Sequence, residues 1–312
     1  MGSGCSRRDF LKIGSTAFAA AILGGCGKKE TKSGGSPLKF KPPDGLSANL
    51  VVTTGADSES KTAEAIAKLG GIEKFVKKGD KVVLKPNAAW ARRPGEGATT
   101  NPAVVEAVAE LCKKAGASQI AVVEHVIDRP ATMVLAVTGI ASAIEKHGVK
   151  ILAPNNESLY KEISLPKGKI LTSELVAKAV LDADVFINLP VAKDHCETRL
   201  SLGMKNLMGI IWDRQAWHQS KSVHQCIADF ATAIRPTLTI LDATTMLLSN
   251  GPKGPGDTRK ENKIIFGTDP VLVDAFGAQL FGLEPKNIEH INIAHTMGIG
   301  EIFTNDNKIF KV

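Results

Sequence analysis

A run of polar and reactive side chains follows a short apolar segment in the middle of the sequence. The apolar segment is Val185–Leu189, bounded by Asp184 and Pro190, and it is typical of a strand buried on both faces of a parallel sheet. The residues just beyond it are Lys193, Asp194, His195, Cys196 and Glu197, and Lys205 and Asn206 follow before Gly209. Ligands bind beyond the carboxyl ends of the strands in open parallel sheets. This stretch therefore predicts a ligand site, although taken alone it names no reaction.

Two of these side chains are predicted to be catalytic. Imidazole gains and loses protons near neutral pH, so His195 is predicted to act as a general acid–base, with Glu197 or Asp242 as its partner. A partly buried lysine can hold an anion or, after losing its proton, serve as a base or nucleophile. Lys193 is predicted to have such a role.

A metal site is the alternative interpretation of the same stretch. Imidazole and thiolate are ligands for zinc, copper and iron, and the candidates are His195, Cys196 and His218, with His224 and Cys226 as further ligands. However, the spacings match no known short metal-binding motif, and adjacent residues tend to point apart on a strand or helix. The sequence leaves the acid–base and the metal interpretations open.

Apolar strands alternate with amphipathic helices from Ala48 onward. Strands are predicted over Leu50–Thr54, Lys81–Lys85, Ile120–Val123, Val149–Leu152, Val185–Leu189, Leu238–Leu241 and Lys263–Phe266, with an edge strand over Tyr160–Leu165. Helices are predicted over Glu59–Leu69, after an N-cap at Asn101, and over Gly139–His147, Leu175–Leu181, Ser222–Ile234, Val271–Phe281 and Ile288–Thr296. This alternation indicates βαβ units. The sequence therefore predicts an α/β fold with a mostly parallel sheet and helices on both faces, in three α/β/α layers.

Polar residues follow several of the predicted strands, and the carboxyl ends of parallel strands meet at one edge of a sheet. Lys85 and Asn87 follow one strand, Glu124 and His125 the next, and Asp242 a later one. Loops at such an edge carry binding residues on a rigid scaffold. The predicted substrate-binding residues are Lys85, Asn87, Lys205, Asn206, His218 and Asp242. Because three lysines converge in this prediction, we expect an anionic ligand such as a carboxylate or a phosphate.

The N-terminal residues indicate export. Ser6–Lys12 matches the twin-arginine signal at every defined position, and the apolar run Ile13–Leu23 after it is too short to span a bilayer. The run ends at Leu23-Gly24-Gly25-Cys26, which resembles a bacterial lipoprotein cleavage site with Cys26 as the lipidated residue. We predict a signal over 1–25, a flexible tether over 26–47, and an α/β domain of one unit or two lobes over 48–312. The mature protein would be lipid-anchored in the periplasm or on the outer face of the envelope.

Charge and cysteine content exclude several classes of function. The 312 residues carry a formal net charge of +7, of which the signal contributes +2 and the tether +3, so only +2 remains for residues 48–312. Because nucleic-acid binding needs a basic face on the domain itself, this balance excludes a nucleic-acid partner. The three cysteines beyond Cys26 contain no C-x-x-C motif, which excludes an iron–sulfur cluster and a four-thiolate zinc site.

Taken in order, the same residues resemble the prokaryotic family called domain of unknown function 362. The resemblance rests on Lys85-Pro86-Asn87, Thr100-Asn101-Pro102, Asn188-Leu189-Pro190 with Lys193 and His195, Lys205-Asn206-Leu207-Met208-Gly209, His218, Asp242, the loop from Gly251 to Gly256, and Asp269-Pro270-Val271 with Asp274. It implies that Lys85, Asn87, Lys193, His195, Lys205, Asn206 and His218 act together. Some members of the family carry an added ferredoxin-like module with cysteine clusters, which this chain lacks. The family's biochemical role is not settled, so the resemblance names no substrate.

Two classes of function agree with these patterns. The first is an exported, lipid-anchored enzyme that binds a small anionic substrate or cofactor at the carboxyl edge of the sheet. The second is a non-catalytic lipoprotein that binds a metal or another ligand and delivers it to a partner, or an assembly factor for exported redox enzymes. The sequence does not identify a cofactor.

Overall fold

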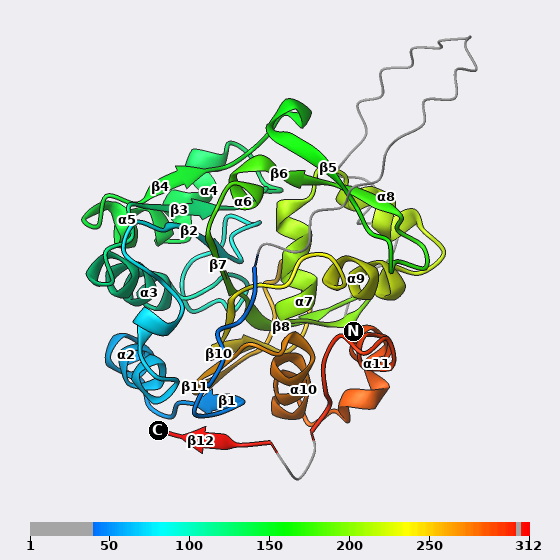
Figure 1. Ribbon diagram of the computed structural model, residues 1–312. Coiled ribbons are helices and arrows are strands. Elements are labelled where there is room, and N and C mark those ends of the chain that lie inside the picture. The colour runs from blue at the N-terminus through cyan, green and yellow to red at the C-terminus, as the bar shows by residue number, and fades with distance from the viewer. Residues whose placement is uncertain (1–39, 304–306) are drawn as a thin grey trace.

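The computed structural model describes residues 40–303 and 307–312 (Figure 1). The predicted signal over 1–25 and the predicted lipidation residue Cys26 lie outside the described residues. Phe40 belongs to the predicted tether, yet it is buried, and its ring centroid lies 5.5 Å from that of Phe186. The packed part of the chain therefore begins before the predicted boundary at Ala48. Within the two described ranges, no helix has the length and apolar composition to cross a bilayer.

A twisted, mostly parallel sheet forms the centre of the described part of the molecule. Its ten strands are β1 (Leu50–Val52), β2 (Lys81–Pro86), β3 (Gln119–Val123), β4 (Lys150–Leu152), β7 (Val185–Leu189), β8 (Val191–His195), β9 (Arg199–Ser201), β10 (Leu238–Leu247), β11 (Thr258–Gly267) and β12 (Ile309–Lys311). The order is β12-β1-β11-β10-β7-β2-β3-β4, with β8 beside β10 and β9 beside β8. Six of its nine strand pairings are parallel, as predicted. A separate antiparallel pair joins β5 (Tyr160–Ser164) to β6 (Ser173–Ala177).

Helices cover both faces of the sheet (Figure 1). Those on one side are α2 (Ser58–Lys68), α3 (Pro102–Lys114), α4 (Ala131–Val137) and α5 (Ile140–Glu145), and those on the other are α6 (Lys178–Leu181), α7 (Gly203–Asn206), α8 (Arg214–Gln219), α9 (Val223–Ala231), α10 (Pro270–Leu280) and α11 (Glu289–Thr296). Four short 3₁₀ helices lie at η1 (Ile72–Lys74), η2 (Glu157–Leu159), η3 (Leu207–Ile210) and η4 (Pro285–Asn287).

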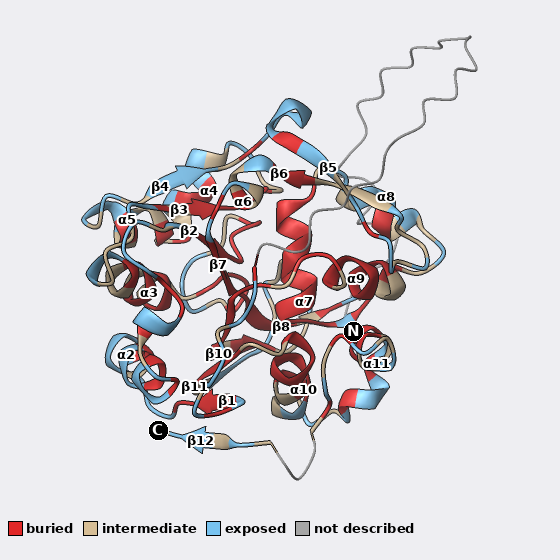
Figure 2. Cartoon of the chain, in the orientation of Figure 1, coloured by how far each residue is buried: buried red, intermediate tan, exposed pale blue. Residues whose placement is uncertain are grey.

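The central strands feed two separate hydrophobic cores. Along β2, Val82 and Leu84 pack into the core under α2 and α3, whereas Val83 between them packs into the opposite core. β7 alternates in the same way, because successive side chains of a strand point to opposite faces. β7 is buried throughout and β2 is buried after Lys81, while β4, β5 and β12 at the margins are largely exposed (Figure 2). This arrangement confirms the predicted three α/β/α layers.

The helix predicted after Asn101 forms as the sequence indicates. The Asn101 side chain accepts a hydrogen bond of 3.0 Å from the backbone N–H of Ala103, and Pro102 occupies the first turn, where its missing N–H costs nothing. Cys112 on this helix and Cys226 on α9 are buried in different cores, so both are packed thiols and cannot join in a disulfide.

The predicted helix over Leu175–Leu181 is wrong in its first half. Ser173–Ala177 is strand β6, whose register pairs Tyr160 with Ala177, and only the one-turn helix α6 follows it. The apolar spacing of this segment is compatible with either element. Pairing with the neighbouring strand decides in favour of the extended form, and this contact is tertiary.

The chain does not leave the sheet after Pro190, because Lys193 and His195 lie on strand β8. Proline has no N–H for the ladder, and one of the two partners changes there: β7 pairs with β2 and β10, whereas β8 pairs with β10 and with the antiparallel β9. β10 is more than twice as long as expected and forms a hairpin with β11, because a loop rather than a helix connects them. The polar run that ends at His195 is therefore held in a sheet.

Candidate functional site

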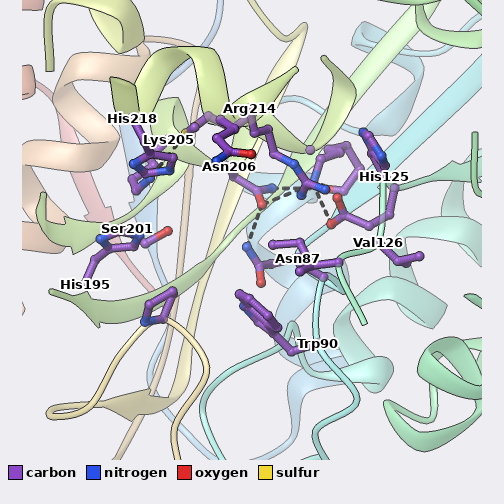
Figure 3. A pocket seen from close by; sticks show the side chains of 18 of the residues that line it. Asn87, Trp90, His125, Val126, His195, Ser201, Lys205, Asn206, Arg214 and His218 are labelled. Atoms are coloured by element: carbon purple, nitrogen blue, oxygen red, sulfur yellow. Dashed lines mark hydrogen bonds and ion pairs between the residues drawn. The ribbon is translucent and has the colours of Figure 1, made fainter. Parts of the chain in front are cut away.

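A cavity of about 540 Å³ lies at the carboxyl ends of β2 and β3 and alongside β8 (Figure 3). Seven of the residues predicted to form the site line it together: Lys85, Asn87, Lys193, His195, Lys205, Asn206 and His218. These residues are up to 133 positions apart in the sequence, and the sheet and two short helices bring them to one place. The structure thus provides the predicted gathering of basic and imidazole side chains.

Asp242 and Cys196 do not take part in the cavity lining, and neither do the further candidates Glu197, His224 and Cys226. The carboxylate of Asp242 accepts hydrogen bonds from the backbone N–H groups of Asn101 (2.7 Å) and Thr244 (2.9 Å), so it ties β10 to the start of α3. Substrate binding by Asp242 is therefore replaced by a structural contact. Cys196 is exposed at the end of β8 and does not line the cavity.

Helix α7 carries Lys205 and Asn206 into the cavity, and a buried carboxylate holds its first turn. The two oxygens of Asp274 accept hydrogen bonds from the backbone N–H groups of Gly203 (2.7 Å) and Met204 (3.0 Å). Burial raises the pKa of Asp274 to about 7. A side chain at position 203 would come within 2.7 Å of the same carboxylate, so only glycine allows this close approach.

Helix α8 carries Arg214 and His218, and two contacts orient it. The side chain of Asp213 caps the helix by accepting a hydrogen bond of 3.0 Å from Ala216 N. Trp217 is buried in the core, where its indole N–H donates to Glu174 at 2.6 Å. With the helix held in this way, Arg214 and His218 both line the cavity.

A chain of amide side chains links the cavity residues to the sheet. Asn206 donates through Nδ2 to Asn188 Oδ1 (2.8 Å) and accepts at Oδ1 from Asn87 Nδ2 (2.9 Å). Asn87 in turn accepts at Oδ1 from Lys193 Nζ (2.9 Å). Every amide in this chain has its donor and acceptor roles fixed by its neighbours, which makes the network rigid.

Three buried lysines line the cavity in different electrostatic settings. Lys85 forms an ion pair of 2.9 Å with the buried carboxylate of Glu124. Burial lowers the pKa of Lys85, and the charge of Glu124 opposes that shift. Among the described residues, Nζ of Lys193 donates to two neutral oxygens and forms no ion pair, and burial lowers the pKa of Lys193 to about 7. Burial also lowers the pKa of Lys205, to about 8.

Two histidine rings stack face to face at the cavity, and their hydrogen-bond partners place the ring proton on different nitrogens. The rings of His195 and His218 are 6.2 Å apart and within 4° of parallel. Nδ1 of His195 accepts backbone N–H groups from Glu197 (3.2 Å) and Thr198 (3.4 Å), which leaves its proton on Nε2. Burial moves the pKa of His195 well below its ordinary value, so this ring is neutral.

The second histidine is paired with a carboxylate. Nδ1 of His218 bonds to Oε2 of Glu197, which places a proton on Nδ1 and makes Nε2 the basic nitrogen. Burial lowers the pKa of His218, while the bond to Glu197 raises it. A base oriented by a carboxylate is the usual arrangement for proton transfer. The acid–base role that was predicted for His195 therefore suits His218 better.

Sequence reasoning missed a group of lining residues, above all Arg214. Among the described residues, none forms a hydrogen bond or ion pair with its guanidinium, which faces the cavity (Figure 3). The rings of His125 and Trp212 stack with centroids 5.6 Å apart and planes within 9° of parallel, and form an aromatic wall; Trp90 also lines the cavity. The signal that the sequence offered was Asp213, a helix-capping residue type directly before Arg214. It indicates where a helix begins, but not where the Arg214 side chain points.

The metal interpretation finds no cluster of ligands in the described part of the chain. Within residues 40–303 and 307–312, no group of three or more His, Cys, Asp or Glu side chains is placed to hold a metal ion. His195 and His218 do lie together, but they stack face to face, and Cys196 is turned to the exterior.

The solved structures similar to this chain include a lactate racemase apoprotein and a protein from Thermotoga maritima. The lactate racemase apoprotein from Thermoanaerobacterium thermosaccharolyticum superimposes with a TM-score of 0.48 at 12% identity, over 77% of this chain and 58% of that chain. A protein from Thermotoga maritima gives a TM-score of 0.47 at 12% identity, over 73% of this chain and 60% of that chain. This chain thus spans less than two thirds of either structure.

The sequence comparisons are more specific. Thylakoid-associated protein sll1697 from Synechocystis sp. (strain ATCC 27184 / PCC 6803 / Kazusa) is 31% identical over 249 residues, which make up 74% of this chain and 72% of that protein. The sequence pattern described as "Domain of unknown function (DUF362)" matches residues 82–279, more than half of the chain. Its span contains every cavity residue named above, and the chain therefore belongs to the DUF362 family.

Proposed function

We propose that this protein is an enzyme that binds a small anionic substrate or cofactor in the cavity at the carboxyl edge of the sheet. The observation that carries the proposal is the set of cationic side chains without a carboxylate partner. Among the described residues, Lys193 and Arg214 line the cavity with no ion pair to any acid. A buried cation that lacks a counter-charge is costly unless a ligand supplies one.

The balance of charge over the whole lining supports an anion. The basic lining residues are Lys85, Arg129, Lys193, Lys205 and Arg214, and the acidic ones are Glu124 and Asp213. Glu124 forms its ion pair with Lys85 and its charge also acts on Lys193 and Arg214, but one carboxylate cannot balance all of these cations. A volume of about 540 Å³ lies in the range of sites for small organic molecules, which suits an organic anion better than a bare inorganic ion.

The same cavity holds groups suited to acid–base chemistry. His218 is oriented by Glu197 and presents its basic Nε2, while His195 presents an N–H donor that stays neutral. A proton could thus move from a bound substrate to His218 while the Nε2–H group of His195 donates to the resulting oxyanion. Lys193, whose pKa lies near 7, is a second group able to exchange a proton in neutral solution.

Replacing Arg214 by glutamine is expected to weaken anion binding by about 10- to 100-fold. A hydrogen bond to a charged group contributes about 1.5–3 kcal/mol, and each 1.4 kcal/mol corresponds to a tenfold change in Kd. Titration calorimetry with citrate and with inorganic phosphate measures the change. The matched control is Arg259→Gln, because Arg259 lies outside the cavity and pairs with Glu261. If wild type and R214Q bind citrate and phosphate with equal affinity, the proposed anion site is contradicted.

We also propose that the protein is exported by the twin-arginine route and anchored in the envelope through a lipid on Cys26. The motif at Ser6–Lys12 and the cleavage-site pattern before Cys26 support this, and the relative from Synechocystis is described as thylakoid-associated. The full chain is expected to partition into the detergent phase of Triton X-114, and Cys26→Ser into the aqueous phase. The same distribution for both proteins would contradict lipidation at Cys26.

A further inference from the structure

Three buried lysines line one cavity, but their amino groups differ in what they contact. Nζ of Lys85 donates to the carboxylate of Glu124 (2.9 Å), to Pro86 O (2.7 Å) and to Asn206 Oδ1 (3.2 Å). An ammonium group has three N–H donors, and here all three have oxygen acceptors, one of them charged. Lys85 is therefore held as a cation, and its nitrogen has no lone pair to offer.

Lys193 and Lys205 have fewer acceptors. Nζ of Lys193 donates to Asn87 Oδ1 (2.9 Å) and to Ala98 O (2.6 Å). For Lys205, the contact that the described residues provide is a single one, from Nζ to the thioether sulfur of Met208 at 3.2 Å. A thioether is a weak acceptor and cannot stabilise an ammonium group as oxygen atoms do. The surroundings of Lys205 therefore favour the neutral amine, and so does its burial, since the residue is only 6% exposed.

We propose that Lys205 is a covalent site, where its amine forms an imine with the carbonyl group of an anionic ligand of the 2-oxo acid or aldehyde class. This proposal rests on the proposed function, because it places the carbonyl compound in the same cavity. The amine of a desolvated lysine is the nucleophile that carbonyl substrates require. Lys205 lines the cavity together with Arg214, which would hold the ligand's anionic group.

The chemistry balances without an external oxidant or reductant. The lone pair of the Lys205 amine attacks the carbonyl carbon, which forms a C–N bond and a carbinolamine. A proton from a neighbouring acid then converts the carbinolamine hydroxyl into water, the C–O bond breaks, and the iminium cation remains. The protonated form of His218, supported by Glu197, is the acid that the cavity provides for this step.

The charges around Lys205 agree with a reactive amine. Burial lowers its pKa to about 8, and the positive charge of Arg214 acts in the same direction, while Glu197 and Cys196 oppose the shift. At neutral pH about a tenth of Lys205 would then be neutral, whereas exposed lysines with a pKa near 10.4 are almost fully protonated. Because of this difference in neutral fraction, an imine on Lys205 can be trapped selectively.

The experiment treats the full-length protein with pyruvate and sodium cyanoborohydride at pH 7 and maps the reduced adduct by peptide mass spectrometry. We expect one adduct per chain, on Lys205, with a rate that saturates as pyruvate increases. It should form at least about 10-fold faster than on Lys150, an exposed lysine of β4, because the desolvated amine of Lys205 is the better nucleophile. Lys205→Arg should lose the adduct, and Lys150→Arg should keep it.

Two results would overturn the covalent site. One is an adduct mainly on Lys193, and the other is labelling spread over the exposed lysines at similar rates. Thermal unfolding of K205R reports whether that variant is folded, and the peptide map of the wild type locates the adduct even if it is not. These outcomes do not depend on knowing the natural ligand.

A parallel titration with inorganic phosphate separates this proposal from the proposed function. If phosphate binds in an Arg214-dependent manner but Lys205 is not labelled, the imine is excluded and the anion site stands. If Lys205 is labelled and phosphate neither binds nor slows the labelling, the covalent site stands and the general anion site falls. Slowing of the labelling by phosphate would support both.

Discussion

Replacing Glu124 by alanine is expected to lower the free energy of unfolding by about 3–5 kcal/mol, since it leaves the ammonium group of Lys85 in the interior without its counter-charge. Lys85 is 0% exposed and Glu124 2% exposed, so water cannot replace the lost partner. Oε2 of Glu124 also accepts the backbone N–H of Ala88 at 2.9 Å, and that donor would lose its acceptor as well. Urea denaturation followed by circular dichroism measures the change.

Two controls separate the buried charge from the mere loss of a side chain. Glu110→Ala removes a carboxylate that pairs with Lys114 on the exposed side of α3, and no measurable change is expected there. The paired replacement Lys85→Met with Glu124→Leu removes both charges and keeps the volume, so it should recover most of the stability that Glu124→Ala loses. If the double variant is as unstable as the single one, packing rather than charge dominates at this position.

Much of the sheet could be predicted because its central strands carry their signal locally. Val82–Leu84 and Val185–Ile187 are continuous apolar runs, and the two cores that they feed explain why no polar residue interrupts them. The ends of these strands could also be located, since the sequence becomes polar there. For this reason the sequence alone is enough to assign Lys85 and Asn87 to one edge of the sheet.

The elements that could not be predicted depend on contacts between distant segments. β6 is a strand because β5 lies beside it, and β8 continues beyond Pro190 because β9 and β10 pair with it. A five-residue segment is too short for its hydrophobic periodicity to indicate such pairings. β12 is similar, since it joins the sheet by pairing with β1 from the far end of the chain.

The candidate site shows the same division. Residues that directly follow a strand could be grouped from the sequence, whereas Arg214 and Trp212 belong to a segment with no strong period. Asp242 also follows the predicted strand Leu238–Leu241, but β10 runs on to Leu247 and leaves Asp242 inside it. Its carboxylate then serves Asn101 and Thr244 instead of the cavity. For Asp242, the extension of β10 thus keeps the carboxylate out of the cavity lining, whereas Lys193 and His195 reach the cavity from within β8.

Gly209 tests how tightly the floor of the cavity is packed, and Gly209→Ala is expected to destabilise the protein by about 1–3 kcal/mol. An added Cβ would lie 2.1 Å from Oε1 of Glu124 and 2.5 Å from Cε of Lys85. Neither side chain can withdraw freely, because the ion pair and Ala88 N hold the carboxylate, and Asn206 and Pro86 hold the ammonium group. The same displacement should weaken the binding of citrate or phosphate, since Lys85 anchors Asn206 in the lining.

The matched control for this substitution is Gly282→Ala, in which the added Cβ meets no atom within 4 Å but the backbone has a φ of +71°. That variant should lose about 1–2 kcal/mol from the left-handed conformation alone, with no effect on anion binding. Denaturation and calorimetry on both variants therefore distinguish a clash inside the site from strain elsewhere. If Gly209→Ala keeps wild-type stability and affinity, the ion pair has room to move. The cavity floor would then be less rigid than the contacts of Glu124 and Lys85 imply, and the large effect expected for Glu124→Ala would have to come from charge alone.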